Sequence, residues 1–143
     1  MKTLLKGEIS FSENHNKWIV KAIVKWNKRV TTIYLNSRKI DLENDFLSCS
    51  LTKSQFFTFL SRSETYNFNG NKSIYSELLF ESVETQCLMD SKKPTIKLDN
   101  KSLIFEGGIR KRDYKSLSNV FMLFETLLDE IDYLHEEYIT QNR

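Results

Sequence analysis

The sequence predicts a single α+β domain in which an antiparallel β-sheet is packed by helices, and three observations lead to this prediction. The final segment, 113–143, carries one apolar stripe at helical spacing. Residues 5–35 alternate apolar and polar side chains and are divided by turn residues, as strands are. Strands, a short helix, more strands and a long helix follow in that order. This order is typical of an antiparallel sheet with helices on one face.

The C-terminal segment is predicted to form one long amphipathic helix. Its apolar residues follow each other at steps of three and four and therefore share one helical face. They are Leu117, Val120, Phe124, Leu127, Ile131, Leu134 and Tyr138. No Gly or Pro interrupts the segment, and Asp113, Ser116 or Ser118 can cap its start. Phe121 and Leu128 widen the stripe, which favours packing on a sheet over the alternative of a homodimer through this helix.

The N-terminal part is predicted to be a three-stranded meander. Strands are expected at 5–11 and 17–26, where side chains of different kinds alternate between two faces, and at 29–35, which is rich in β-branched and aromatic residues. A polar turn at 12–16 separates the first two, and Asn27-Lys28 suits a tight hairpin turn. In the second strand the tryptophans and the lysines fall on opposite faces.

The middle of the chain carries weaker signals. Residues 36–45 are expected to be a loop, and the capping box of Thr52 and Gln55 predicts a short helix from Lys53 to about Arg62. Asn69-Gly70 is typical of a hairpin turn. The spacing of the apolar residues in 76–89 suits a helix or a strand, and we expect a strand over 74–83.

A last hairpin precedes the long helix. Strands are predicted at 94–98 and 102–106, joined by Asp99-Asn100-Lys101, and Gly107-Gly108 follows them.

Length and composition favour one cytoplasmic domain spanning residues 1–143. The chain is 40% hydrophobic and 13% aromatic, which suffices for a packed core. No signal peptide or membrane-spanning stretch is recognisable, and two cysteines are too few for a disulfide framework. Cys49 and Cys87 are therefore expected to be inert core residues. The abundance of Lys, Asn, Ile, Phe and Tyr suits an AT-rich, bacterial genome.

Charge is distributed in blocks of opposite sign, although the net charge is only +2. Residues 1–40 hold nine Lys or Arg against two acids, and residues 41–90 hold three against eight. Residues 91–112 are again basic, with seven against two, and residues 113–143 are acidic, with two against seven. Such blocks form charged patches where the fold keeps them apart.

The sequence contains no catalytic, cofactor or metal signature. The two histidines, His15 and His135, have no companions at a recurring ligand spacing, and His135 is placed on the exposed side of the last helix. There is no nucleophile elbow, and Gly107-Gly108 does not match a phosphate-binding loop. We therefore predict a protein without enzymatic activity, cofactor or metal. An enzyme with a site assembled from dispersed residues is the third and weakest hypothesis.

The acidic residues of the last helix are the first candidate site. They are Glu125, Asp129, Glu130, Asp132, Glu136 and Glu137. Acids in the late turns and bases at the start oppose the helix dipole, so local helix stability does not explain this order. Two explanations remain open, namely neutralisation by basic strands of the same fold and recognition of a basic partner. We predict a small protein-binding module, such as an inhibitor, an immunity-type protein or an adaptor.

Nucleic-acid binding is the alternative function. Its candidate residues line the second strand and its turn and precede the last helix. They are Lys17, Lys21, Lys25, Arg29, Arg110, Lys111 and Arg112. Lysines at alternate positions of a strand can follow a phosphate backbone, although lysines on an edge strand also prevent aggregation.

Overall fold

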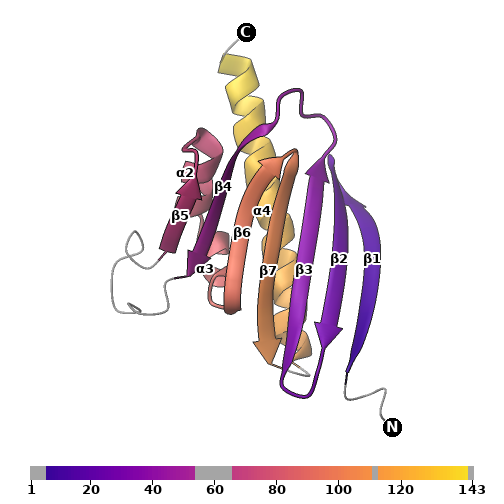
Figure 1. Cartoon of the computed structure of the whole chain (residues 1–143). Helices are drawn as coiled ribbons and strands as arrows, with labels where there is room; N and C mark the ends of the chain where they lie inside the picture. Colours follow the sequence, from indigo (N-terminus) through magenta and orange to yellow (C-terminus); the bar gives the residue numbers. More distant parts are fainter. Residues whose placement is uncertain (1–5, 54–65, 111–112, 142–143) are drawn as a thin grey trace.

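One seven-stranded antiparallel sheet, with helices on one of its faces, forms the structure (Figure 1). The computed structural model describes residues 6–53, 66–110 and 113–141, and the helices and strands named below lie within them. The strands are β1 (Gly7–His15), β2 (Trp18–Trp26), β3 (Val30–Lys39), β4 (Phe46–Lys53), β5 (Tyr66–Gly70), β6 (Lys92–Asn100) and β7 (Ser102–Arg110). The helices are α2 (Ile74–Glu81), α3 (Val83–Leu88) and α4 (Tyr114–Gln141). The predicted α+β class is confirmed.

The strand order is β1-β2-β3-β7-β6-β4-β5, so the last two strands of the chain occupy the middle of the sheet. The predicted meander forms the β1-β2-β3 side, and the predicted hairpin of β6 and β7 is also present. Strand β3 pairs with β7 from Val30 opposite Arg110 to Arg38 opposite Ser102. This pairing joins the N-terminal meander to the rest of the sheet.

The inner face of the sheet holds the core, because apolar side chains alternate with polar ones along each strand. Trp18, Leu35 and Phe105 are fully buried on this face, and Ile96 and Leu51 continue it toward β4. Burial of each such side chain contributes about 1.5–3 kcal/mol. The opposite face carries the alternate, more polar residues.

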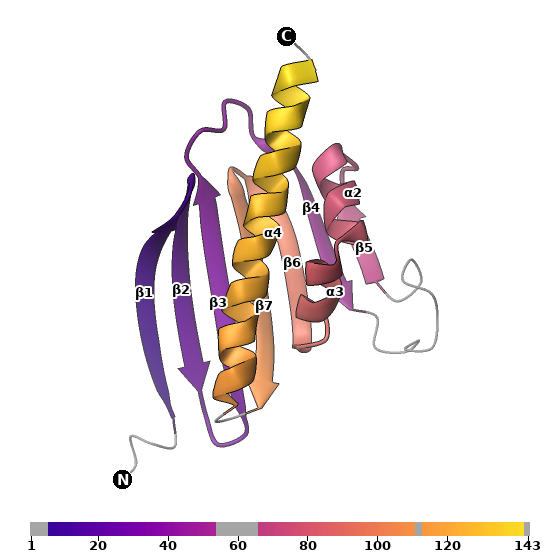
Figure 2. The same ribbon diagram turned by 180° about the vertical axis from the view of Figure 1, so that it is seen from behind.

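Helix α4 crosses the inner face beside β7, and α2 and α3 lie next to it (Figure 2). Asp113 caps its start, as the sequence allows, by accepting hydrogen bonds from the Ser116 backbone N–H at 3.0 Å and the Ser116 hydroxyl at 2.7 Å. These bonds hold the pKa of Asp113 below its ordinary value. The apolar stripe is buried from Val120 to Ile131, after which the buried face continues to His135 rather than to Tyr138.

The expected strand over 74–83 is wrong, because this segment forms α2 and, after a break at Ser82, α3. Ser73 caps α2 by accepting a bond from the Ser76 backbone N–H, and the Ser76 side chain returns a bond to the Ser73 backbone. Leu79 and Val83 stand four residues apart, which is a helical interval as much as a strand interval.

The expected hairpin at Asn69-Gly70 is also wrong, because Gly70 ends β5 and the chain continues into α2. The sequence prediction missed β4, whose register shifts between Phe46 and Cys49 and so breaks the alternation. Lys53 ends that strand, while the rest of the helix predicted over 53–62 lies outside the described residues.

Two smaller predictions concern the cysteines and the membrane. Cys49 is buried as expected, but Cys87 is exposed, and both are free thiols. No helix in the described part of the chain is long and apolar enough to cross a membrane.

Candidate functional site

The most unusual polar cluster lies where the second half of α4 meets the start of β2, the end of β3 and the loop that follows. At its centre is Lys39, the last residue of β3, whose side chain is 1% exposed. Lys39 is on the inner face because it continues the alternation of Ile33, Leu35 and Ser37. A buried ammonium group requires carboxylate partners, and the fold supplies them here.

Two carboxylates and one indole surround the Lys39 ammonium group. Its Nζ atom donates to Oδ1 of Asp132 on α4 and lies 2.9 Å from Oδ1 of Asp41. The same Oδ1 atom of Asp132 accepts a hydrogen bond of 2.9 Å from Nε1 of Trp18. Lys39 Nζ also lies 5.3 Å from the centre of the Trp18 ring, within cation–π range.

A second, more exposed lysine extends the cluster toward solvent. Lys17 Nζ lies 3.2 Å from Oδ2 of Asp41 and 3.7 Å from Oε1 of Glu136. The hydrogen bond to Asp41 raises the pKa of Lys17. Burial of Asp41 opposes its ionisation, but hydrogen bonds from Lys39 and Lys17 outweigh burial and lower the pKa of Asp41. The network therefore holds Lys17 and Asp41 in their charged forms.

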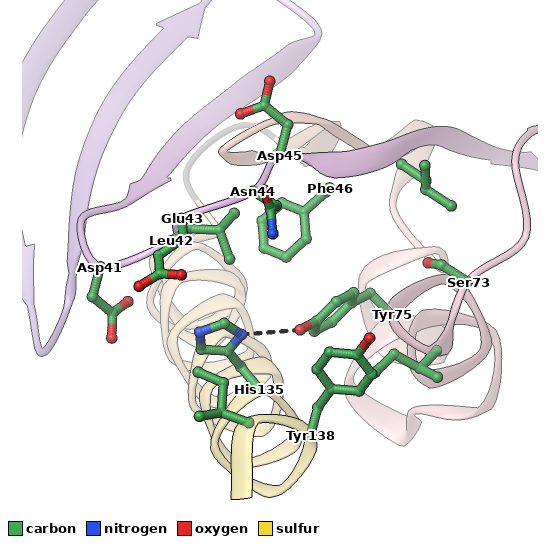
Figure 3. Close-up of a pocket in the computed structure, with 13 residues that line it drawn as sticks. Asp41, Leu42, Glu43, Asn44, Asp45, Phe46, Ser73, Tyr75, His135 and Tyr138 are labelled. Carbon is green, nitrogen blue, oxygen red and sulfur yellow. Dashed lines mark hydrogen bonds between the residues drawn. The ribbon is translucent and has the colours of Figure 1, made fainter. Parts of the chain in front are cut away.

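His135 lies beside this network with one of its two ring nitrogens unpaired (Figure 3). The residue is 8% exposed, and its Nδ1 atom lies 3.0 Å from the hydroxyl of Tyr75 on α2. Its Nε2 atom is buried and has no hydrogen-bond partner among the described residues. Burial and the nearby charge of Lys39 lower the pKa of His135, so the imidazole is neutral at pH 7. An unpaired buried polar atom costs about 1–3 kcal/mol and calls for an explanation.

A hollow of about 730 Å³ lies beside His135, between α4, the start of α2 and the loop 40–45. We call it the acidic hollow. Its lining combines carboxylates with aromatic and aliphatic side chains. It comprises Asp41, Leu42, Glu43, Asn44, Asp45, Phe46, Leu47, Ser73, Ile74, Tyr75, His135, Tyr138 and Ile139. Its volume lies within the range of ligand pockets.

The rim of the acidic hollow is apolar and open to solvent. Leu47 is 52% exposed, Tyr138 50%, Ile139 39% and Ile74 37%. Glu43 and Asp45 are exposed, and no cation in the described part of the chain forms an ion pair with either. Apolar side chains next to acids that form no ion pair are a suitable contact surface for a basic partner.

The structure divides the six acids of the C-terminal helix between two flanks of α4. Glu125 lies 2.7 Å from His15 Nδ1, and Asp129 lies 2.9 Å from His15 Nε2. Asp132 and Glu136 continue this flank, since the four acids follow each other at steps of three and four. Their partners are basic or indole side chains at the β1-β2 turn, on β2 and on β3. This pairing within the fold matches the first of the two explanations offered for their order.

Glu130 and Glu137 belong to the other flank. Glu130 is hydrogen-bonded to Glu84 of α3, and burial together with this neighbouring acid raises the pKa of Glu130 to about 7. The carboxylate of Glu137 lies next to the Tyr133 hydroxyl, whose pKa it raises. The six acids therefore do not form one continuous surface.

The residues of the nucleic-acid alternative are also distributed. Lys21 and Lys25 project from the outer face of β2, where Lys25 lies 3.6 Å from Glu8. Arg29 and Arg110 lie near each other at one end of the sheet, because Val30 pairs with Arg110. Lys111 and Arg112 lie outside the described residues. Strand β2 is an inner strand rather than an edge strand, so protection against edge pairing does not explain its lysines.

Sequence reasoning missed the residues that matter most in this cluster. Lys39 was assigned to a loop but is the last residue of β3, while Asp41 lies in the loop as predicted. The prediction that His135 is exposed is wrong. One signal was available for His135, since it follows Ile131 by four residues and so continues the buried stripe. No sequence pattern connects Tyr75 to it.

Comparison of the chain with models of protein families, with curated proteins and with solved structures gives no match. Within the described residues no group of three or more His, Cys, Asp or Glu side chains is arranged to hold a metal ion.

Proposed function

We propose that this protein is a non-enzymatic binding module that recognises a basic protein partner through the acidic hollow. In this proposal an Arg or Lys side chain of the partner enters the hollow, and the apolar rim packs against the residues around it. An inhibitor, an immunity-type protein or an adaptor would be such a module. The observation that carries the proposal is the unpaired Nε2 atom of buried His135, which lines the hollow together with Glu43 and Asp45, two acids without an ion pair among the described residues.

The charge balance supports a cationic ligand. Five carboxylates belong to the cluster and the hollow, against two lysines, and the histidine is neutral. The carboxylates are those of Asp41, Glu43, Asp45, Asp132 and Glu136. A negative potential of this kind attracts a basic partner and accelerates its association.

The Tyr75–His135 pair supports a hydrogen bond to that cation. A phenol can donate to Nδ1 or accept from it, so either tautomer of the neutral ring preserves the bond with Tyr75. With the proton on Nδ1, the Nε2 atom becomes an acceptor for a guanidinium or ammonium donor. The aromatic ring of Tyr138 adds a surface on which a guanidinium group can stack.

The alternative function, nucleic-acid binding, has weaker support. Lys17 and Lys25 already pair with acids of the same chain, and Trp18 is fully buried, so basic residues and stacking aromatics are not interleaved. Its signature is an affinity that falls steeply with salt.

The test uses random peptides displayed on phage and selected against the full chain. We expect the selected peptides to be rich in Arg or Lys flanked by apolar residues. The double variant Glu43→Gln/Asp45→Asn should bind a selected peptide at least about tenfold more weakly, because each lost charge pair costs about 1 kcal/mol or more.

Glu106→Gln is the matched control, because it also removes an exposed acid but lies on the outer face of β7. It should bind the selected peptides like the unmodified chain. Selected peptides that lack basic residues, or that bind the double variant with undiminished affinity, would refute the proposal.

A further inference from the structure

Strand β1 forms one edge of the sheet, and its outer backbone groups are not used by any strand of the described chain. It pairs with β2 over all nine residues, from Gly7 opposite Trp26 to His15 opposite Trp18, without a shift in register. An edge of this length and regularity is a template for another strand.

Strand β1 carries two charged residues, Glu8 and Glu13, but several other protections of an edge strand are missing. Its sequence, Gly-Glu-Ile-Ser-Phe-Ser-Glu-Asn-His, contains no Lys and no Pro, and no bulge twists it away. Strand β5 at the other edge is different, because it has five residues and ends at Gly70 with a φ of 111°. Natural edges that remain free are generally short, charged or irregular.

Apolar side chains on the inner side of β1 are left half-covered. Ile9 is 54% exposed and Phe11 43%, and Figure 2 shows that α4 runs along the middle of the sheet, so that it covers β1 only in part. The two side chains open on an apolar groove of about 760 Å³ between β1, β2 and the start of α4. Phe121 of α4 forms the opposite wall, with its ring centre 5.7 Å from that of Phe11.

We infer that β1 pairs antiparallel with β1 of a second copy of this chain, about a two-fold axis that passes between the two Ser10 residues. Such an axis stands perpendicular to the sheet, so the two sheets join into one and both α4 helices lie on the same face. The half-exposed residues of the two strands then cover each other between the two helices.

The register follows from the side chains of β1. Directly opposed residues of an antiparallel pair point to the same face, so Phe11 can face only odd-numbered residues of the copy. Centring the pair on Ser10 places Ile9 opposite Phe11 twice, and such aromatic–aliphatic pairs stabilise a sheet. It also places Glu8 opposite Ser12 and Glu13 opposite Gly7, so no acid faces an acid.

Neighbouring registers are less complementary. Centring on Phe11 places Ile9 opposite Glu13, and centring on Ile9 places Glu8 opposite Ser10 but leaves Phe11 opposite Gly7. The Ser10 register also spares His15, which stays bound to Glu125 and Asp129 outside the seven paired residues. The self-complementarity of this register is what favours a second copy over a strand of another protein.

Cysteine cross-linking tests the register directly. In a chain with Cys87→Ser, which removes the exposed thiol, Ser10→Cys should form a disulfide between two copies under mild oxidation. Opposed residues of an antiparallel pair have Cα atoms about 4.5–5.5 Å apart, and a disulfide needs about 4.4–6.8 Å. The matched variant Ser12→Cys, on the same face, should not cross-link because it faces Glu8 of the copy.

Sedimentation equilibrium tests the association itself. The unmodified chain should reach twice the 16.9 kDa of one copy, and Ile9→Lys should raise the dissociation constant at least about tenfold. Asn67→Lys, which changes an exposed residue on the β5 edge, should leave the mass unchanged.

A chain that stays at 16.9 kDa up to about 1 mM would overturn the inference, and an unassociated chain that binds a strand of another protein would do so too. Cross-linking through Ser12→Cys in preference to Ser10→Cys would overturn the register. Because β1 takes no part in the acidic hollow, these outcomes are independent of the proposed function.

Discussion

Replacing Lys39 by Met removes the buried ammonium group and keeps the length of the side chain, so the change isolates the charge. Asp132, whose side chain is 15% exposed, then loses one of its two hydrogen-bond donors and keeps only Nε1 of Trp18. Asp41 is less affected because Lys17 remains 3.2 Å away. Removing one partner of a buried pair costs about 3–5 kcal/mol. Because other donors remain, we expect the free energy of unfolding to fall by about 3 kcal/mol.

Urea unfolding followed by tryptophan fluorescence measures this loss, and Trp18 reports on the site because its ring contacts Lys39. A destabilisation of about 3 kcal/mol lowers the melting temperature by roughly 10 °C in a chain of this size. The control is Lys25→Met, which breaks an exposed pair with Glu8 at 3.6 Å and should cost less than about 1 kcal/mol.

The double variant Lys39→Met/Asp132→Leu separates charge pairing from burial. It removes both charges, so it should be more stable than Asp132→Leu alone, which leaves a buried ammonium group with Asp41 as its remaining near partner. A loss below about 1 kcal/mol for Lys39→Met would refute the reasoning, because it would mean that Asp132 is not desolvated.

Three further predictions concern Glu130, His135 and Gly70. The pKa of Glu130 is raised from 4.5 to about 7, so between these pH values the folded chain binds more protons than the unfolded chain. The free energy of unfolding should therefore fall as pH rises through this range, and Glu130→Gln should lack this fall. His135→Phe removes the unpaired Nε2 atom but also the hydrogen-bond partner of the Tyr75 hydroxyl, and because these effects oppose each other stability should change by less than about 1 kcal/mol. Selected basic peptides should bind at least about tenfold more weakly. Gly70→Ala should cost about 1–3 kcal/mol, because φ is 111° and the new Cβ would lie 2.4 Å from the Ser48 carbonyl oxygen.

Each of these predictions has a control and a contrary result. Glu106→Gln should keep the pH dependence of the unmodified chain, and an unchanged pH profile in Glu130→Gln would contradict the assignment to Glu130. Peptide binding that survives His135→Phe would exclude Nε2 as a ligand contact. Asn69→Ala, next to Gly70, should be nearly neutral in thermal unfolding, and equal stability of Gly70→Ala would contradict the predicted clash.

Elements with a regular pattern of apolar residues could be predicted from the sequence, because each further residue supports the same period. Helix α4 and the meander β1-β2-β3 are of this kind, since long runs of side chains show a single period. The prediction for segment 74–83 failed because the four-residue interval between Leu79 and Val83 fits a strand as well as a helix. Strand β4 was missed because its irregular register near Phe46 hides the alternation.

The candidate site was harder to predict because its contacts join distant parts of the chain. Lys39 reaches Asp132 across 93 positions, and Tyr75 reaches His135 across 60. From sequence alone a lysine is assigned to the surface, because lysines are rarely buried unless they are paired with carboxylates. The charge blocks left open whether the acids of the last helix meet basic strands of the same fold or a basic partner, and they do not specify which pairs form.

The position of β6 and β7 in the sheet has a consequence for biosynthesis. Strands β6 and β7 join the two halves of the sheet, since β7 pairs with β3 and β6 pairs with β4. Both follow β1 to β5 in the chain and therefore leave the ribosome after them. Until residues 92–110 have emerged, the N-terminal meander and the β4-β5 pair each present an open side. Contacts between such remote segments form slowly, and nascent chains with uncovered strands tend to aggregate. The chain therefore depends on its last third for cooperative folding, and holding chaperones are expected to contact the meander during translation.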